Sequence, residues 1–442
     1  MEQKKNPRKI AIDILCDIDK KGSYSNILLR NRLHEFGDVR DRAFVTELVY
    51  GVIQNRLYID YVLDHFSKIK TKKMTYDVLN ILRVGAYQIL FLDKVPQSAA
   101  VNESVELAKK MTNHGSVGFI NGVLRSVCNK MDTITWPENL LDRLSVLYSF
   151  APWIVSLFYK RVGEDCEMLL KAMSKPSSIV LRVNTLKTTR DNLLLALEKN
   201  DIKAEPIALC PDGILCGGFD IGESSLYKEG FFSVQDTAAQ ICSRILNPQP
   251  EERVLDVCAA PGGKTCYMAE LMKNTGYIEA LDIYEHKKSL IDEQAKRLGI
   301  SIIHSKVQDA LSYQSKEVYD KVLVDAPCSG LGIIARKPEI KWNRTKKQIE
   351  DFSVIQYNIL KNSSRFVKVG GELMYSTCTL TNQENEEVVN RFISESPNFE
   401  PCDISPFLPA NLKEMQKNGM ITLWPHKTGI DGFFIAKMKR VK

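Results

Sequence analysis

The stretch VLDVCAAPGGKT, which runs from Val254 to Thr265, places an apolar segment directly before a proline-glycine turn and the polar start of a helix. Glycine has no Cβ, so Gly262 and Gly263 let a ligand come close to the backbone at this turn. The amino end of the following helix favours an anionic or acceptor-rich group. The stretch therefore predicts a strand, a ligand-binding turn and a helix of an α/β domain.

Three classes of ligand compete for this turn. A P-loop needs GxxxxGK[ST], which would place its first glycine at the position of Cys258, so Lys264 and Thr265 do not complete that motif. A dinucleotide site needs GxGxxG, and the turn lacks that spacing. The remaining class is S-adenosylmethionine (SAM), whose methyltransferases use a similar strand, turn and helix without binding a pyrophosphate.

From residue 250 onward, apolar runs typical of strands alternate with helical patterns. Strands are predicted at residues 253–259, 277–283, 301–310, 321–327, 371–377 and 432–440. This alternation predicts a mostly parallel, Rossmann-like sheet that is covered on both faces by helices. Such sheets bind ligands beyond the carboxyl ends of their strands, so the residues that follow each strand are the candidates for a site.

Acidic residues end three of these predicted strands, at Asp282, Asp309 and Asp325. Asp282 comes 19 residues after Gly263, and an acidic residue at about this spacing commonly binds a ribose hydroxyl. Asp309 could accept a hydrogen bond from an adenine amino group. Taken singly, each aspartate also fits a helix cap or a turn. The ordered set of three favours a nucleoside site.

Two cysteines follow neighbouring strands, Cys328 in DAPCSG and Cys378 in YSTCT, and we expect both thiols to face one crevice beside the ligand turn. Methylation of a pyrimidine at C5 needs such a thiol, because thiolate addition to C6 makes C5 nucleophilic toward a sulfonium methyl group. Asp325 could hydrogen-bond the ring N3, and protonation of N3 would need a raised pKa in a water-poor pocket. The residues alone leave the nucleophile open, since DNA cytosine-C5 enzymes attack with the cysteine of a Pro-Cys pair, which would indicate Cys328.

The rest of the composition bounds the class of protein. The chain has 11 cysteines, but it has no CxxC pair and no cysteine-histidine cluster with zinc-ligand spacing, so we expect reduced thiols and no metal. The N-terminal MEQKKNPRK has no apolar signal core, and no apolar run approaches the roughly 20 residues of a membrane span. These observations predict a cytoplasmic protein with no membrane partner, and we expect a monomer.

The chain divides into three predicted domains. Residues 1–130 show helical periodicity without strand signals, which predicts an all-α bundle. Residues 131–235 combine helical patterns with the strand pattern of SSIVLRVNTL, which predicts a small α+β, RRM-like module, and residues 236–442 form the α/β domain. Residues 1–130 hold 21 Lys and Arg against 14 Asp and Glu, a net +7, whereas the rest carries −1. This excess fits a polyanion partner, most often nucleic acid, and equally a solvated helix surface.

Three long segments carry a family resemblance: VLDVCAAPGGKT, DAPCSGLGIIARKPEIKW and YSTCTLTNQENEEVV. They resemble the signature segments of the RNA cytosine-C5 methyltransferases of the RsmB/Sun (Fmu) family, and FFSVQDTAAQ and DGFFIAKMK resemble its flanking segments. The helical N-terminus, with RAFVTELVYGVIQNRLYIDYVL, is similar to the NusB-like domain of the RsmB subgroup. The resemblance covers essentially the whole chain.

The resemblance implies a reaction and a set of roles. It implies methyl transfer from SAM to C5 of a cytosine in 16S (small-subunit) rRNA, with S-adenosylhomocysteine as the product. The RNA would be free or in an early small-subunit assembly intermediate, and a tRNA or another RNA is the alternative substrate. Cys378 would be the nucleophile, Cys328 would assist product release, and Asp325 would orient the base. The cofactor would contact Cys258, Ala259, Ala260, Pro261, Gly262, Gly263, Lys264, Asp282, Asp309 and Asp325.

A run of basic residues follows DAPCSG. Arg336, Lys337, Lys341 and Arg344 could hold RNA phosphates near the pocket, although a solvated loop explains them equally well.

Overall fold

The computed structural model describes residues 6–21, 25–33, 36–176 and 178–442. The chain forms two compact units, the first comprising Met1–Ser174 with Lys337–Asn343 and the second Lys175–Arg336 with Arg344–Lys442. We refer to them as the helical unit and the catalytic unit, and each is described by itself.

The sequence predicts an all-α bundle for residues 1–130, and the helical unit also includes residues 131–174 and 337–343. No strand occurs among its described residues, whose main elements are α-helices. They are α1 (Pro7–Lys21), α2 (Ser25–Leu33), α3 (Val39–Gln54), α4 (Arg56–Phe66), α5 (Tyr76–Phe91), α6 (Gln97–Met111), α7 (His114–Asn129), α8 (Leu140–Tyr148), α9 (Pro152–Val162), α10 (Cys166–Ser174) and the short α16 (Ile340–Asn343). Apolar side chains spaced three and four residues apart, such as Leu48 and Val52 of α3, are buried in one core with Leu82 and Leu124. Burial of this stripe on each helix drives the bundle together.

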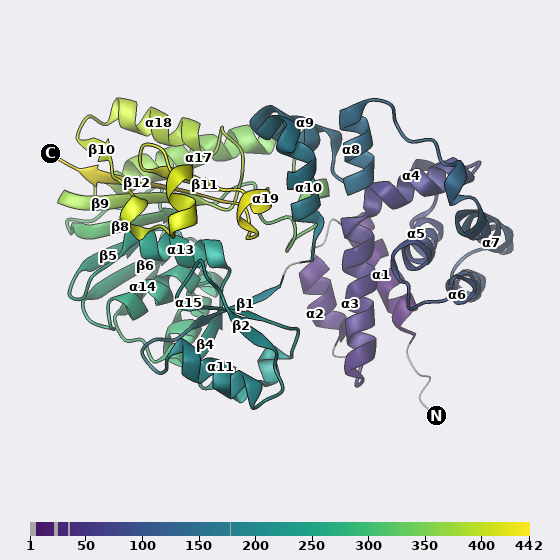
Figure 1. Cartoon of the computed structure of the whole chain (residues 1–442), viewed down its shortest axis with the longest axis horizontal. Coiled ribbons are helices and arrows are strands. Elements are labelled where there is room, and N and C mark those ends of the chain that lie inside the picture. Colours follow the sequence, from purple (N-terminus) through teal and green to yellow (C-terminus); the bar gives the residue numbers. More distant parts are fainter. Residues whose placement is uncertain (1–5, 22–24, 34–35, 177) are drawn as a thin grey trace. The chain divides into compact units, whose positions relative to one another are not determined.

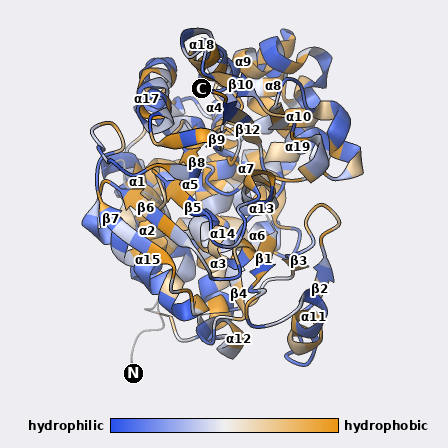
Figure 2. Ribbon diagram, turned by 90° about the vertical axis from the view of Figure 1, so that its left-hand side faces the viewer, coloured by the Kyte–Doolittle hydropathy of each residue, from blue (hydrophilic) through white to orange (hydrophobic). Residues whose placement is uncertain are grey.

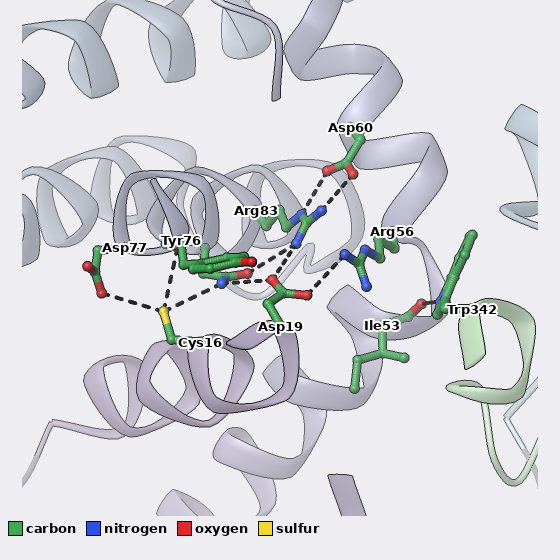
Figure 3. A network of polar contacts seen from close by, with 10 residues as sticks. Cys16, Asp19, Ile53, Arg56, Asp60, Tyr76, Asp77, Arg83 and Trp342 are labelled. Atoms are coloured by element: carbon green, nitrogen blue, oxygen red, sulfur yellow. Dashed lines mark hydrogen bonds and ion pairs between the residues drawn. The ribbon is translucent and has the colours of Figure 1, made fainter. Parts of the chain in front are cut away.

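A network of buried charges crosses the helical unit (Figure 3). Arg83 on α5 binds Asp60 of α4 with two hydrogen bonds of 2.7 Å, and its third nitrogen donates to Asp19 of α1 at 2.9 Å. Arg56 reaches the other oxygen of Asp19 at 3.0 Å. These cations are therefore committed to internal carboxylates, so the net charge of this region overstates the charge that a partner would meet.

The catalytic unit begins with a small antiparallel sheet. Its strands β1 (Ile179–Val183), β2 (Ala204–Pro206), β3 (Gly213–Cys216) and β4 (Phe232–Val234) are ordered β2-β3-β1-β4, and α11 (Arg190–Glu198) and α12 (Ser225–Lys228) accompany them. The strand predicted in SSIVLRVNTL is β1, and residue 177 in that segment lies outside the described residues. Strands β2 to β4 were not predicted, because three or four residues are too few to show a period of two.

The main sheet has eight strands in the order β10-β12-β9-β8-β5-β6-β7, with β11 paired to β12. The strands are β5 (Arg253–Asp256), β6 (Tyr277–Asp282), β7 (Ile303–Val307), β8 (Tyr319–Asp325), β9 (Val367–Thr377), β10 (Phe399–Pro401), β11 (Met420–Leu423) and β12 (Phe433–Arg440). Strands β5 to β9 pair in parallel, as predicted, and β10 to β12 add antiparallel pairs at one edge. Because β5 pairs with β6 on one side and β8 on the other, the chain changes direction along the sheet at the end of β5, where such folds bind ligands.

Helices cover both faces of this sheet (Figure 1). The helices are α13 (Thr237–Leu246), α14 (Gly263–Leu271), α15 (Glu285–Leu298), α17 (Lys346–Ser364), α18 (Glu386–Glu395) and α19 (Pro425–Thr428). Alternate residues of each strand face opposite layers, so Leu323 and Met374 pack with α13 and α14, whereas Val324 and Tyr375 pack with α17 and α18. Figure 2 shows the resulting pattern, with hydrophobic colour on the central strands and both colours on the covering helices.

Candidate active site

A cavity of about 280 Å³ lies at the carboxyl end of β5. It is lined by Val234, Gln235, Asp236, Ala239, Asp256, Cys258, Ala259, Ala260, Pro261, Gly263, Lys264, Asp325 and Arg336. Gly262 in the turn has a φ of 101°, and a Cβ there would lie 3.2 Å from the Cα of Ile291. Only glycine therefore fits this turn without strain, and the turn shapes one wall of the cavity.

The small sheet supports this turn through a fully buried arginine, Arg182 of β1. Its guanidinium donates to the carbonyl oxygen of Gly263 at 2.7 Å and to Glu270 Oε1 on α14 at 2.7 Å. It also donates to the side-chain oxygen of Gln235. Two residues of the cavity wall, Gln235 and Gly263, thus depend on a strand that is 53 and 81 positions away in the chain. Sequence reasoning missed Arg182, because nothing local marks it as more than an alternating strand residue.

Asp256, the last residue of β5, is a second residue that the sequence reasoning missed. Its Oδ2 accepts a hydrogen bond of 2.7 Å from Thr265, while its buried Oδ1 has no protein partner. Burial raises the pKa of Asp256 to about 7, against the hydrogen bond from Thr265, which lowers it. The sequence carried a signal for Asp256, because it is an acidic residue at the end of a strand. Asp282 and Asp325 were selected for that same reason.

Lys264 and Asp325 form an ion pair in the cavity, with Nζ and Oδ2 2.6 Å apart. Ser376 donates to the other oxygen of Asp325 at 2.8 Å, so both oxygens of this carboxylate accept hydrogen bonds. Burial lowers the pKa of Lys264, but the charge of Asp325 and the hydrogen bond to it outweigh that effect, and the pKa is raised overall. The pair places a fixed cation and anion beside the ligand turn.

The two predicted cysteines lie side by side, with Sγ of Cys328 and Sγ of Cys378 3.3 Å apart. This is a hydrogen-bonding contact, since a disulfide bond is about 2.05 Å long. The parallel pairing of β8 with β9 sets Asp325 opposite Ser376, which brings the loops after both strands together. The pKa of Cys328 is raised well above its ordinary value, chiefly by the hydrogen bond with Cys378 and then by burial. Both thiols are half-buried, so small molecules can reach them.

The other predicted acids lie apart from the cavity wall. Asp282 is buried at the end of β6, where it accepts from the Tyr284 amide at 3.3 Å. Burial, the charge of Asp256 and the charge of Asp325 raise the pKa of Cys258, and the charge of Asp282 adds to them. Asp309 comes two residues after the end of β7, and its side chain accepts from the amide of Leu311 at 2.9 Å. The turn-forming alternative for Asp309 is therefore the one that the structure displays.

The prediction that the basic run holds phosphates is wrong for Lys341. Its side chain is fully buried in the helical unit, where Nζ donates to the carbonyls of Gln54 at 3.1 Å and Tyr148 at 3.3 Å. Nζ also lies 4.0 Å from the centre of the Phe150 ring, and burial lowers the pKa of Lys341 well below its usual value. The neighbouring residues are mostly charged or polar, so the sequence gave no warning of this burial.

Two further members of that run also have internal partners. Arg336 forms an ion pair with Asp431, and Arg344 donates to the carbonyl of Ser329 at 2.8 Å. Lys337 is exposed, and its contact with phosphate stays a prediction.

Two wider searches covered the part of the chain that the structure describes. No group of three or more His, Cys, Asp or Glu side chains there is placed to hold a metal ion. No single helix there is long and apolar enough to cross a bilayer, although the bent pair Leu140–Tyr148 and Pro152–Ser174 passes that test together.

A parallel-rich sheet with a glycine turn after its first strand defines the catalytic unit as an α/β methyltransferase domain. Family models match three parts of the chain: 16S rRNA methyltransferase RsmB/F over residues 243–439, the NusB family over 5–129, and the ferredoxin-like domain of RsmF/B-like methyltransferases over 150–218. The resemblance drawn from the sequence is thereby confirmed.

Full-length relatives agree with these models. The chain is 37% identical to the probable ribosomal RNA small subunit methyltransferase B of Bacillus subtilis, with 99% of each chain covered. It is 30% identical to ribosomal RNA small subunit methyltransferase B of Escherichia coli O1:K1, again over 99% of each. The chain belongs to the RsmB/F family of 16S rRNA methyltransferases.

Solved structures show the same fold. The crystal structure of PH0851 superposes with a TM-score of 0.83 at 27% identity, with both chains covered completely. NSun6 from Pyrococcus horikoshii with SFG, an analogue of SAM, gives a TM-score of 0.59 at 24% identity and covers 70% of this chain and 99% of its own.

Proposed function

We propose that this protein transfers a methyl group from SAM to C5 of a cytosine in 16S rRNA, through a covalent bond between a cysteine and C6. The observation that carries the proposal is the pair of sulfur atoms, Cys328 and Cys378, 3.3 Å apart. Addition to C6 needs a nucleophile and removal of the C5 proton needs a second group, and two adjacent thiols provide both. The names of the relatives support small-subunit rRNA as the substrate.

The cavity beside the glycine turn fits SAM. Its volume lies near the lower end of ligand pockets, about 300 Å³. The buried Oδ1 of Asp256 has no protein partner, so it can accept a hydrogen bond from a ligand. The glycine at position 262 lets a ligand approach the backbone closely. Asp282 would hold the ribose hydroxyls, and the contact of Asp309 with the cofactor stays a prediction. When bound, SAM supplies an electrophilic methyl group.

We assign Cys378 as the nucleophile. The raised pKa of Cys328 keeps that thiol protonated, so Cys328 can donate a hydrogen bond to Sγ of Cys378, and Cys378 is the sulfur that attacks. A bond forms between Cys378 Sγ and C6, and the electron pair released at C5 takes the methyl group. The C5 proton then leaves, its electron pair restores the double bond between C5 and C6, and the bond from C6 to sulfur breaks. Cys328 passes its own proton to the departing sulfur of Cys378 as it takes up the proton from C5.

Asp325 would orient the target base. Its carboxylate is fixed by Lys264 at 2.6 Å and by Ser376 at 2.8 Å. Asp325 lines the cavity in this position. A fixed carboxylate can accept a hydrogen bond from the exocyclic amine of cytosine and distinguish that base from uracil. The base must leave its stack to reach the thiols, so the target lies in a loop or is flipped out.

The helical unit would bind the RNA, because residues 1–130 carry a net charge of +7, which favours a polyanion partner even though Arg83 and Arg56 are paired with internal carboxylates. We propose a cytoplasmic monomer that acts on free rRNA or on an early assembly intermediate of the small subunit.

The substrate is tested by mapping 5-methylcytosine in 16S rRNA and in tRNA, with and without the gene. We expect one 16S position to lose its methyl group when the gene is deleted. Unchanged 16S methylation together with a lost tRNA methyl group would instead establish the alternative substrate.

The roles of the thiols are tested with two substitutions. Cys378→Ala is expected to abolish turnover and the covalent RNA adduct, whereas Cys328→Ala is expected to accumulate an adduct that survives denaturant. Cys402→Ala, in a half-buried position outside the cavity lining, serves as the control. An adduct present in the Cys378 variant and absent in the Cys328 variant would reverse the assignment.

A further inference from the structure

A buried carboxylate that the mechanism above does not use, Glu384, lies in the loop between β9 and α18. The side chain is fully buried, and both of its oxygens accept hydrogen bonds. Oε1 accepts from the amide of Ser329 at 2.8 Å and from Nε2 of Gln356 at 3.1 Å. Oε2 accepts from the hydroxyls of Ser329 at 2.6 Å and Thr381 at 2.9 Å.

These contacts join the two cysteine loops. Ser329 directly follows Cys328, and Thr379 directly follows Cys378, and their hydroxyl oxygens lie 2.7 Å apart. The hydroxyl of Thr379 is 3.4 Å from Oε2 of Glu384. One carboxylate therefore contacts the residue after each cysteine, and both loops are fixed by the same group.

Four hydrogen bonds of 2.6 to 3.1 Å surround this buried carboxyl group. Burying a carboxylate in this way costs free energy unless hydrogen bonds compensate it, so four close donors indicate that the position is built for an anion. Gln356 links the same oxygen to the carbonyl of Pro327 at 2.9 Å, which supports the Cys328 loop from its other side.

The charge of Glu384 also acts on Cys328. The hydrogen bond with Cys378, burial and the charge of Cys378 raise the pKa of Cys328 in that order, and the charge of Glu384 raises it further. The other ionisable neighbours include Asp325, which precedes Cys328 by three residues and is paired with Lys264, and Tyr375, whose pKa is raised well above its usual value by burial. Arg344 donates to the carbonyl of Ser329. Glu384 is the group among them whose carboxylate contacts the residue after each cysteine.

We infer that Glu384 is a positioning residue that clamps the two cysteine loops together and holds a carboxylate beside Cys328, so that the two sulfur atoms meet in one arrangement. The inference deepens the proposed cytosine-C5 reaction and rests on it for its catalytic consequence. Its structural part, the clamp and the carboxylate beside Cys328, is independent of any substrate.

The substrate-independent test measures alkylation of each cysteine by iodoacetamide as a function of pH, read by peptide mass spectrometry on the full-length protein. In Glu384→Gln, the midpoint for Cys328 is expected to fall by about one pH unit or more, because a like charge that opposes its ionisation has been removed. The matched control is Glu387→Gln, since Glu387 is exposed at the start of α18 and accepts only from Asn382 at 2.6 Å among the bonds seen. Its midpoint is expected to equal that of the wild type.

The catalytic test compares turnover with cofactor affinity. Glutamine places an NH2 group against either the Ser329 amide or the cluster of hydroxyls, so the loops shift, and kcat is expected to fall by about tenfold to a hundredfold. The Kd for SAM, measured by calorimetry, is expected to stay within about twofold, because Glu384 does not line the cofactor cavity. Turnover and alkylation equal to those of Glu387→Gln would overturn the inference.

If Glu384→Gln does not fold, Ser329→Ala replaces it as the test, since that variant removes one hydroxyl donor and keeps the amide contact. The charge of Glu384 remains in that variant, so the Cys328 midpoint is not expected to fall, whereas kcat is expected to fall with an unchanged Kd for SAM because the clamp is weakened; an unchanged kcat counts against the inference. Failure of the proposed reaction would show as turnover that survives Cys378→Ala, while the alkylation result still decides the role of Glu384.

Discussion

Two groups of buried charges, one in each unit, differ in how completely they are paired. In the helical unit, all three nitrogens of Arg83 have carboxylate partners, on Asp19 and Asp60 (Figure 3). In the catalytic unit, Oδ1 of Asp256 is buried at the cavity wall without a protein partner. A fully paired group stabilises one structure, whereas an incompletely paired group at a cavity is available to a ligand. The difference separates a structural network from a binding site.

The largest expected effect comes from breaking the complete network. Arg83→Met leaves Asp19 and Asp60 without their buried cation, which should destabilise the helical unit by about 3–5 kcal/mol. The measurement is the free energy of unfolding from urea titration. Arg40→Met removes an exposed ion pair with Asp38 and should leave the unfolding midpoint unchanged. Equal effects of the two substitutions would show that the Arg83 network contributes no more than a surface pair.

The raised pKa of Asp256 predicts that the free energy of unfolding depends on pH. Because the native pKa of Asp256 is raised to about 7, the unfolded chain releases this proton at lower pH than the native protein does. The contribution of Asp256 to the free energy of unfolding is fully present below about pH 4 and is lost as pH rises to about 7. The loss is at most about 4 kcal/mol. Asp256→Asn should remove this decline, as measured by urea unfolding at pH 5 and pH 8. A decline of unchanged size in the variant would contradict the assignment.

A smaller effect is expected from replacing Arg182, the residue of β1 that supports the cavity wall. Arg182→Lys keeps a cation beside Glu270 but cannot hold Gly263, Gln235 and Glu270 together, because lysine lacks the planar fork. We expect the Kd for SAM to rise about tenfold, which is about 1.4 kcal/mol. Arg190→Lys, on the neighbouring α11, is the control, since its contacts at 3.5 Å are with carbonyls away from the cavity. Unchanged affinity in Arg182→Lys would mean that the turn holds its shape without this strand.

The smallest effect tests whether a buried amine behaves like the buried guanidinium. Lys341 has no carboxylate partner among the contacts seen. Burial lowers its pKa well below the usual value, which favours the neutral amine. Lys341→Met should therefore cost only about 1 kcal/mol, from two lost hydrogen bonds partly offset by apolar packing. Urea unfolding of this variant beside Arg83→Met measures the difference. A cost equal to that of Arg83→Met would show that Lys341 carries a charge in the native state.

Much of the fold followed from local patterns. The glycine turn, the alternation of strands and helices and the helical N-terminus were predicted, because each depends on neighbouring residues and on periods of two or 3.6. The short strands β2 to β4, β10 and β11 were missed, since three or four residues carry too little periodicity.

The sequence by itself determined which strand ends carry chemistry: the turn at Gly262, the acid at Asp325 and the thiols of Cys328 and Cys378. Only the tertiary structure decided how they are supported. Arg182 reaches Gly263 across 81 positions, and Glu384 joins the cysteine loops across 55. The fold also buries Lys341 inside the helical unit, so this lysine does not lie on the surface. Hydrogen bonds between distant residues are set by packing, which local sequence patterns do not encode.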